Sequence, residues 1–234
     1  MQIMPLGDCA LRVEFGREIE LGTHARVQAA WAALDAAALP GVREIVPAYT
    51  TLTLYYDPVA LAAAGAPPND LVGWLGLRME QTIARGAKAA KARRQAITIP
   101  VCYGGTFGPD LEKLATRAKL SVDEFIRRHT KPEYRVAMIG FAPGFPYLAG
   151  LPKELSAPRL AHPRAIVAPG SVGIAGGQTG IYPIATPGGW NLIGRTPLRL
   201  FLPEQNPPTL LQSGDRVQFR AITSAEFDKL EAAP

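Results

Sequence analysis

The sequence predicts an α+β protein in which a small N-terminal α/β domain, residues 1–94, precedes a domain of short β-strands, residues 95–234. Two observations predict this division. Strand and helix patterns alternate in the first domain, whereas the second is rich in β-branched residues, glycine and proline. The basic, alanine-rich residues 86–94 lie between these patterns and mark the boundary. An apolar share of 47% over 234 residues is enough for a sizeable buried core.

The N-terminal domain is predicted to contain three strands and two helices. Residues 9–15 have the pattern of a strand, and apolar side chains recur at helical spacing over residues 27–38. Residues 42–57 contain two more extended runs. Asn69 is placed to cap a helix with an apolar stripe over residues 71–83. We interpret the tryptophan and methionine residues at this spacing as core residues rather than as a cofactor site.

The second domain is predicted to be a barrel or sandwich of short strands, of which residues 97–101 are the first. Two helices follow and are expected to plug or flank the sheet. One opens at residues 109–110, and the other has Ser121 and Glu124 in the positions of a capping box. A last short helix opens at residues 224–226. The further strands are predicted at residues 134–141, 165–175, 181–186, 190–194, 198–202 and 215–222.

Composition argues against several classes of function. Positive charge gathers in residues 85–94, but no nucleic-acid-binding module or interleaved aromatic residue accompanies it, so no nucleic-acid partner is expected. Asp8 and Arg12 interrupt the apolar N-terminus, which argues against a secretion signal and favours the cytoplasm. Cys9 and Cys102 form neither a C-x-x-C pair nor a zinc pattern. We therefore expect no metal site and interpret both cysteines as buried.

Residues 165–194 carry no charged side chain and mix glycine and proline with β-branched and aromatic residues. This composition predicts ordered short strands and tight turns, and the many breaks argue against a membrane span. Four glycines within residues 173–180 surround Gln178 and Thr179. They could form a backbone nest for an anion, although turns of a barrel need the same residues and are the favoured interpretation.

Basic side chains flank this uncharged segment, and no carboxylate occurs between Glu154 and Glu204. Guanidinium groups that converge on one cleft would bind a carboxylate or phosphate. Arg164 and Arg195 border the uncharged segment and are the preferred anion ligands. His162 could be a neutral base or a structural turn residue. The basic residues of the interval are Arg159, His162, Arg164, Arg195 and Arg199.

A rigid aromatic loop, residues 140–152, follows a predicted strand and contains Phe141, Phe145 and Tyr147. Such a loop can line a pocket, anchor a partner chain or simply pack on itself. The chain has candidate anion ligands but no nucleophile elbow and no clear set of acid and base residues. This combination indicates part of an active site that a partner completes.

Four long motifs carry a resemblance to a known family. They are VCYGGTFGPDLE (101–112), EYRVAMIGFAPGFPYLAGLP (133–152), SVGIAGGQTGIYP (171–183) and TPGGWNLIGRTPLRLF (186–201). These segments closely resemble the family of 5-oxoprolinase B-subunits, which also contains Kip-type inhibitors of a histidine kinase. The family has been labelled allophanate hydrolase subunit 1 and is similar to part of the carboxyltransferase domain of urea carboxylases.

The resemblance implies a small N-terminal α/β domain followed by a cyclophilin-like antiparallel β-barrel. It also implies a non-autonomous hydrolase subunit that works with a larger C-subunit of related fold and with an A-subunit. The assembly opens 5-oxo-L-proline to L-glutamate at the expense of ATP, with magnesium. No tightly bound cofactor is expected in this chain itself. The carboxylate of the substrate would suit a cleft that contains arginine.

The candidate site combines the residues with this resemblance. We expect His162, Arg164 and Arg195 to be catalytic and Phe141, Phe145 and Tyr147 to meet a partner. Two other functions stay open. One is inhibition of a sensor histidine kinase through the barrel surface, and the other is a role in a urea- or allophanate-type carboxyltransferase. The residues expected to contact the substrate or an anion are Ser171, Gln178, Thr179, Tyr182 and Asn191.

Overall fold

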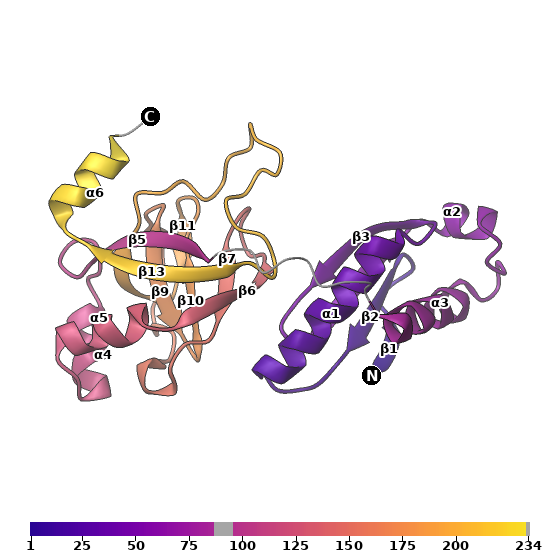
Figure 1. The fold of residues 1–234 in the computed structure, drawn as a ribbon, viewed down its shortest axis with the longest axis horizontal. Coiled ribbons are helices and arrows are strands. Elements are labelled where there is room, and N and C mark those ends of the chain that lie inside the picture. The colour runs from indigo at the N-terminus through magenta and orange to yellow at the C-terminus, as the bar shows by residue number, and fades with distance from the viewer. Residues whose placement is uncertain (87–95, 233–234) are drawn as a thin grey trace. The chain divides into compact units, whose positions relative to one another are not determined.

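The computed structural model describes residues 1–86 and 96–232. The chain divides into two compact units, residues 1–93 and 94–234, which we name the N-terminal unit and the barrel unit (Figure 1). The boundary predicted after residue 94 lies outside the described residues, as does most of the basic run. In the described part of the chain, no helix combines the length and the apolar character that a membrane span needs.

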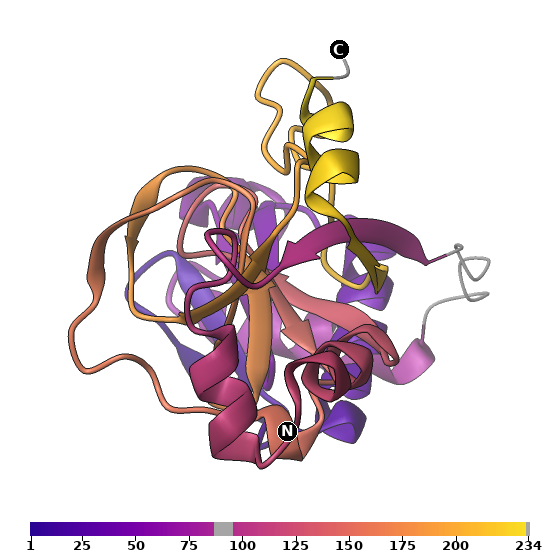
Figure 2. The same cartoon turned by 90° about the vertical axis from the view of Figure 1, so that its left-hand side faces the viewer.

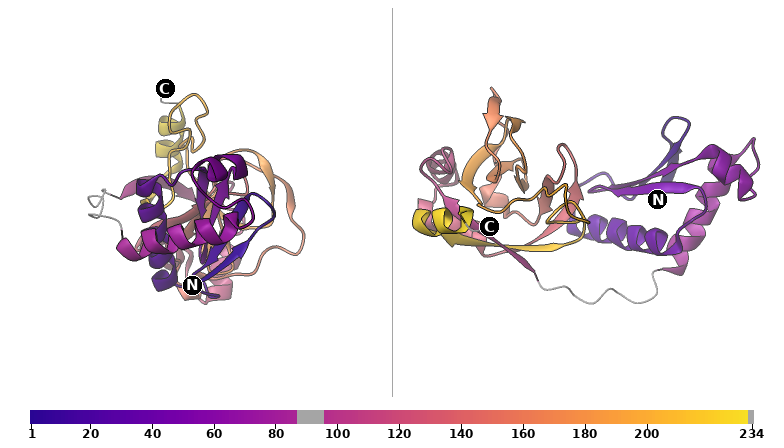
Figure 3. Two further views of the ribbon diagram at one scale, coloured as in Figure 1. Left: turned by 90° about the vertical axis from the view of Figure 1, so that its right-hand side faces the viewer. Right: turned by 90° about the horizontal axis from the view of Figure 1, so that it is seen from above.

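The N-terminal unit is one antiparallel sheet in the order β1-β2-β4-β3. Helices α1 and α3 contact each other and pack on one face of the sheet (Figure 3). Strand β1 was not predicted from the sequence, because its four residues are at most half-buried and show no clear alternation. The elements are β1 (Gln2–Pro5), β2 (Ala10–Glu14), α1 (Leu21–Ala37), β3 (Val42–Pro47), β4 (Thr51–Tyr56), α2 (Pro58–Ala63) and α3 (Leu71–Arg85).

Aspartates begin two helices of this unit. The Asp70 carboxylate accepts a hydrogen bond from the Gly73 N–H at 3.0 Å, so Asp70 caps α3 in place of the predicted Asn69. Asp57 accepts from two backbone amides at the start of α2. Either residue type can cap a helix, and the closing hydrogen bond decides between neighbours. Cys9 is exposed, contrary to the prediction, because it lies in the turn before β2.

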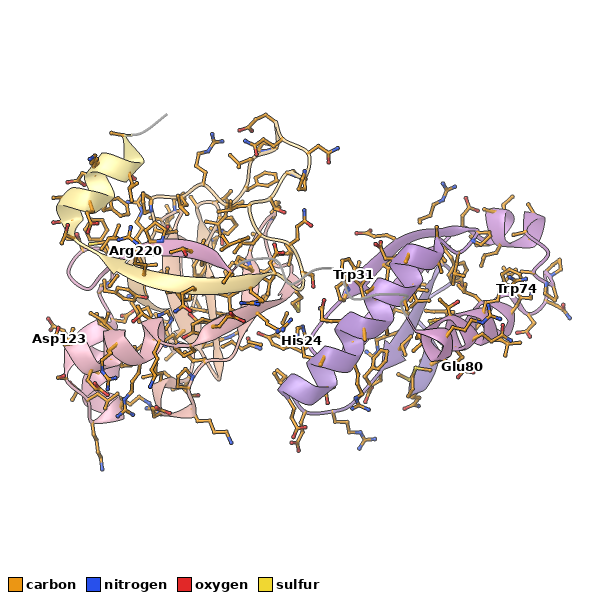
Figure 4. The ribbon with its side chains drawn as sticks, in the orientation of Figure 1. His24, Trp31, Trp74, Glu80, Asp123 and Arg220 are labelled. Carbon is orange, nitrogen blue, oxygen red and sulfur yellow. The ribbon has the colours of Figure 1, made fainter. Side chains whose placement is uncertain are left out.

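The tryptophans of the helices contribute to packing, as their spacing predicts. Trp31 on α1 and the fully buried Met79 on α3 belong to one hydrophobic cluster. Trp74 is half-buried, and the guanidinium carbon of Arg78 lies 4.1 Å from the centroid of its ring (Figure 4). These contacts agree with a core role for the stripe on α3.

Seven strands of the barrel unit close into a barrel in the order β10-β7-β6-β13-β5-β12-β9, which confirms the predicted fold class. The pair β5–β13 is parallel and the other pairs are antiparallel, so the barrel is not antiparallel throughout. Strands β8 and β11 form a separate two-stranded sheet. The strands are β5 (Ile97–Tyr103), β6 (Glu133–Ile139), β7 (Pro146–Ala149), β8 (Arg164–Val167), β9 (Ser171–Ala175), β10 (Gln178–Ile181), β11 (Thr186–Gly188), β12 (Asn191–Arg195) and β13 (Arg216–Ile222).

Helices cover the two ends of the barrel unit. Helices α4 (Leu111–Ala118) and α5 (Val122–Thr130) lie beside each other at one end, and α6 (Ser224–Glu231) lies at the other (Figure 2). A short 3₁₀ turn, η1 (Lys153–Leu155), contacts α4 and α5. Apolar side chains of α4 and α5 join the barrel core, so these helices flank and close it as expected.

The predicted capping box at the start of α5 forms only in part. Ser121 Oγ accepts from the Glu124 N–H at 3.2 Å, but the Glu124 carboxylate binds Arg127 and Arg128 instead of the backbone. The complete capping box lies at α6, where Thr223 and its partner three residues later satisfy each other. At α5 the glutamate is bound by two arginines, and its half of the capping box stays open.

Local predictions fail at some points in the barrel unit, and one alternative left open by the sequence is decided. Residues 198–202 form no strand, only an isolated bridge, because prolines at both sides limit backbone pairing. The glycine segment forms no anion nest. Gly173 and Gly180 pair across strands β9 and β10, and Gly176 donates its N–H to the carbonyl oxygen of Ala157. The favoured interpretation as barrel turns is the one observed.

Candidate functional site

The barrel unit carries a small, open pocket with a cavity volume of about 80 Å³, which is below the range typical of drug-sized ligands. Its wall combines the loop and strand that follow β6, a residue that precedes β8, and the chain from the end of β10 to the turn after β11. The lining residues are Phe141, Phe145, Tyr147, Arg159, Tyr182, Pro187, Gly188, Gly189 and Trp190.

Aromatic rings form most of this wall. Phe145 is almost fully buried, and its ring meets those of Tyr182 and Trp190 edge to face at centroid distances of 5.2 and 5.4 Å. The rings of Tyr147 and Phe141 lie 4.8 and 5.4 Å from the same phenylalanine. Edge-to-face contacts fix the orientation of each ring. The pocket is therefore formed before any ligand arrives.

Hydrogen bonds within residues 140–146 hold the aromatic loop in shape. The Gly140 N–H donates to the carbonyl oxygen of Phe145 at 3.1 Å, and the Phe145 N–H donates to that of Ala142 at 3.0 Å. Phe141 has a φ of 69°, which bulky residues rarely adopt, and it is 62% exposed. The predicted aromatic trio thus lies together, with Phe145 as a buried wall and Phe141 on the surface.

Arg159 brings a positive charge to the pocket. Burial raises the pKa of both Tyr147 and Tyr182, and the charge of Arg159 opposes the rise at each. At Tyr182 a backbone hydrogen bond from Trp190 opposes it as well. None of the ion pairs between described residues includes Arg159, and no other charged side chain lines the pocket.

A carboxylate from a distant segment binds Arg164. The guanidinium donates to Asp110 at 2.8 Å, and the second carboxylate oxygen of this aspartate accepts from the Leu192 N–H at 2.7 Å. The interval without carboxylates is therefore not a region without negative charge, because the fold brings Asp110 to it. Arg164 also reaches the carbonyl oxygen of Trp190 at 3.5 Å, so it supports the pocket wall from outside.

Arg195 ties β12 to the C-terminal helix. Its Nε donates to the carbonyl oxygen of Pro169 at 2.9 Å, and its NH2 donates to Glu231 at 3.2 Å. The guanidinium carbon also lies 5.4 Å from the centroid of the Phe227 ring. Arg195 is not among the residues that line the pocket.

Thr179 belongs to a buried polar network inside the barrel. Its hydroxyl donates to the carbonyl oxygen of Gly173 at 3.0 Å and therefore accepts from Nε2 of His129 at 3.1 Å. Nδ1 of His129 then accepts from the Tyr103 hydroxyl at 2.8 Å. Burial lowers the pKa of His129 to about 3, so this imidazole is neutral at physiological pH.

Of the other predicted ligand residues, Tyr182 lines the pocket and the rest do not. Asn191 is buried and donates to two backbone carbonyl oxygens at 2.8 and 3.1 Å. Ser171 is buried in β9, and Gln178 is half-buried in β10. His162 is exposed on the chain that leads into β8.

Three residues of the pocket wall were not singled out as site residues from the sequence. Arg159 was visible only as one of several cations, and Trp190 only as an apolar residue of the uncharged segment. Gly188 looked like a turn residue. A Cβ atom at Gly188 would lie 2.4 Å from the Tyr182 hydroxyl, so the absence of a side chain there is what lets Tyr182 take its place in the pocket wall.

The two units together define a class of protein in which a small α+β unit accompanies a closed barrel that bears an aromatic-lined pocket. Comparison with known families gives a match over residues 1–211 to the carboxyltransferase domain, subdomain C and D. The chain belongs to this family, which also includes the B-subunit of 5-oxoprolinase. The resemblance identified from the motifs is thereby confirmed.

Relatives match nearly the whole chain. It is 47% identical to the 5-oxoprolinase B-subunit of Bacillus subtilis (strain 168), with 97% of this chain and 95% of the relative covered. It is 40% identical to the 5-oxoprolinase B-subunit of Escherichia coli O157:H7, with 92% and 93% covered. A crystal structure of TTHA0988 superposes with a TM-score of 0.76 at 37% identity. That match covers 92% of this chain but only 40% of the longer TTHA0988 chain.

Proposed function

We propose that this chain is a subunit of an ATP-dependent 5-oxoprolinase that converts 5-oxo-L-proline to L-glutamate. The observation that carries the proposal is the 47% identity to a 5-oxoprolinase B-subunit over 95% of its length. The preformed pocket supports it, because its small volume and its single cation suit a small organic acid.

The chain supplies a binding surface and depends on a partner for the chemistry. The pocket lining holds one arginine and two tyrosines but no histidine, lysine, cysteine or carboxylate that would transfer a proton near neutral pH. ATP and magnesium would accordingly be bound by the complex, together with a larger C-subunit of related fold and an A-subunit. The TTHA0988 chain joins a matching segment to a longer polypeptide, which favours a partner that packs directly on this chain.

Three other residues predicted for the site, Arg164, Arg195 and Phe141, have specific roles in this proposal. Arg164 positions the pocket wall through Trp190, and Arg195 holds α6 against the barrel. Phe141 is exposed beside the pocket and is the aromatic residue that we assign to the interface with the larger partner. A partner seated there would also close the open mouth over the substrate.

The test is 5-oxoproline-dependent hydrolysis of ATP. We expect no turnover from this chain alone and turnover when it is mixed with its two partner subunits. Absence of turnover from the mixture, with all three subunits shown to be folded, would overturn the proposal. Inhibition of a sensor kinase or carboxylation of a urea-type substrate would then be measured on the same preparation.

A further inference from the structure

The pocket of the barrel unit has the chemistry to recognise both polar ends of a small cyclic acid. Arg159 is the only charged side chain that lines it, and it forms no ion pair with the described residues. A guanidinium group without a carboxylate partner, next to apolar walls, is a site for an anionic ligand. The nearest arginine in the chain, Arg164, is already bound to Asp110 and cannot take this role.

Tyr182 supplies a second polar group to the lining of the pocket. The backbone N–H of Trp190 donates to its oxygen. The proton of the hydroxyl is then left to donate, and among the described residues no acceptor takes it. Gly188 lets the hydroxyl end of the Tyr182 ring pack against its backbone, since a Cβ atom there would lie 2.4 Å from the hydroxyl oxygen. A ligand carbonyl oxygen is the acceptor that fits such a donor.

The aromatic rings that line the pocket favour a flat, compact ligand. Tyr147 and Trp190 pack edge to face at a centroid distance of 5.8 Å, and both contact the buried Phe145. Fixed rings bury a small ring without a loss of side-chain freedom, because their orientation is already set.

From this geometry we propose that the pocket is the substrate-binding site of the assembly. Arg159 binds the carboxylate of a small cyclic amide acid, and the Tyr182 hydroxyl donates to the carbonyl oxygen of its ring. This assignment rests on the proposed function, which makes 5-oxo-L-proline the ligand. It moves the anion-binding role from Arg164 and Arg195 to Arg159.

Calorimetric titration of the three-subunit complex without ATP tests the proposal. The probes are 5-oxo-L-proline and its primary carboxamide, which lacks the negative charge. The wild-type complex should bind the acid about 10- to 100-fold more tightly than the amide, as expected for a hydrogen bond between charged groups. Arg159→Gln should remove this preference. Arg199→Gln, a matched change at an exposed arginine outside the pocket, should retain it.

Steady-state kinetics of the same complex give an independent readout. Arg159→Gln should raise the KM for 5-oxoproline about 10- to 100-fold and leave the KM for ATP unchanged. Tyr182→Phe should weaken binding of the acid and the amide alike, because both ligands keep the ring carbonyl. If the substitutions raise the KM for ATP as much as the KM for 5-oxoproline, these residues have a structural role and the assignment is overturned.

The outcomes separate this proposal from the proposed function. A wild-type complex that is active, with an Arg159→Gln variant of unchanged KM and unchanged preference for the acid, overturns the binding site alone. An inactive wild-type complex overturns the oxoprolinase function. If that inactive complex still prefers the acid over the amide, and Arg159→Gln removes the preference, the carboxylate site is supported. If the inactive complex binds both probes equally, or binds neither, the carboxylate site is overturned.

Discussion

Asp110 shows how a single residue can join segments that lie far apart in the sequence. Its two carboxylate oxygens bind the Arg164 guanidinium and the Leu192 N–H, and the residue is only 8% exposed. Removal of one partner from such a buried arrangement leaves the other groups without compensation. The sequence could not predict this contact, because nothing in the local pattern around residue 110 points to β8 or β12.

We predict that Asp110→Ala lowers the free energy of unfolding by about 2–3 kcal/mol, because it leaves a buried N–H and a half-buried guanidinium unpaired. Urea denaturation followed by circular dichroism measures the change. Asp123→Ala is the matched control, since Asp123 is exposed on α5 (Figure 4), and it should change the free energy by less than about 0.5 kcal/mol. Equal effects of the two substitutions would contradict this role.

His129 makes the stability of the barrel unit dependent on pH. Burial lowers its pKa to about 3 in the folded state, whereas an unfolded histidine has a pKa near 6.5. Above pH 6.5 both states are neutral and the full stability is present. As the pH falls from 6.5 towards 3, only the unfolded state gains the proton. The free energy of unfolding should therefore fall by up to about 1.4 kcal/mol per pH unit.

Urea denaturation at a series of pH values between 7.5 and 4 isolates this contribution when wild type is compared with His129→Gln. The variant cannot titrate at this position, so the difference in free energy between the two proteins should shrink as the pH falls. His162→Gln is the control, since His162 is exposed, and its difference from wild type should stay constant. Parallel profiles for His129→Gln and wild type would contradict the prediction.

At the scale of elements, helix ends show what a sequence pattern can and cannot decide. Residues 224–226 were predicted to open the last helix, and Thr223 is the residue that caps it. Two successive hydroxyl residues carry the same signal, and only the backbone conformation distinguishes them. The β9–β10 hairpin poses the same problem, because its glycines look alike in sequence but have different surroundings.

Gly180 and Gly177 provide a matched pair in that hairpin. A Cβ atom at Gly180 would lie 3.0 Å from the Phe145 ring and 2.8 Å from the carbonyl oxygen of Pro146, whereas one at Gly177 would meet nothing within 4 Å. Gly180→Ala should therefore destabilise the protein by about 1–3 kcal/mol through overpacking, and Gly177→Ala should be nearly neutral. Thermal and urea denaturation measure both. A neutral Gly180→Ala would mean that Phe145 is not held tightly in the pocket wall.

At the scale of the whole molecule, the sequence predicts the succession of a small α/β domain and a barrel, since periodicity and composition change along the chain. Which side chains line the pocket depends instead on how the barrel closes. Strand pairing brings Tyr182 next to Trp190 and Arg159, and no local pattern records that meeting. The same closure supplies Asp110 to the segment that looked free of negative charge.

In the aromatic loop, the exposed ring and the backbone conformation of Phe141 contribute little to the stability of the fold. Phe141 is 62% exposed and holds a φ of 69°, a conformation that costs a bulky residue free energy. Exposure of an aromatic ring on a rigid loop is typical of an anchor for a partner chain. Asparagine adopts this backbone conformation readily, so Phe141→Asn removes the ring without strain.

We expect Phe141→Asn to weaken association with the larger partner by at least about tenfold, the loss typical of an aromatic anchor. The melting temperature of the isolated chain should not fall, because the ring is mostly exposed and asparagine adopts this backbone conformation at lower cost. Calorimetry in the absence of substrate separates association from occupancy of the pocket. Leu230→Asn, at an exposed apolar residue outside the pocket, is the control and should leave association unchanged. Wild-type affinity in Phe141→Asn would place the interface elsewhere and leave Phe141 as an edge of the ligand pocket.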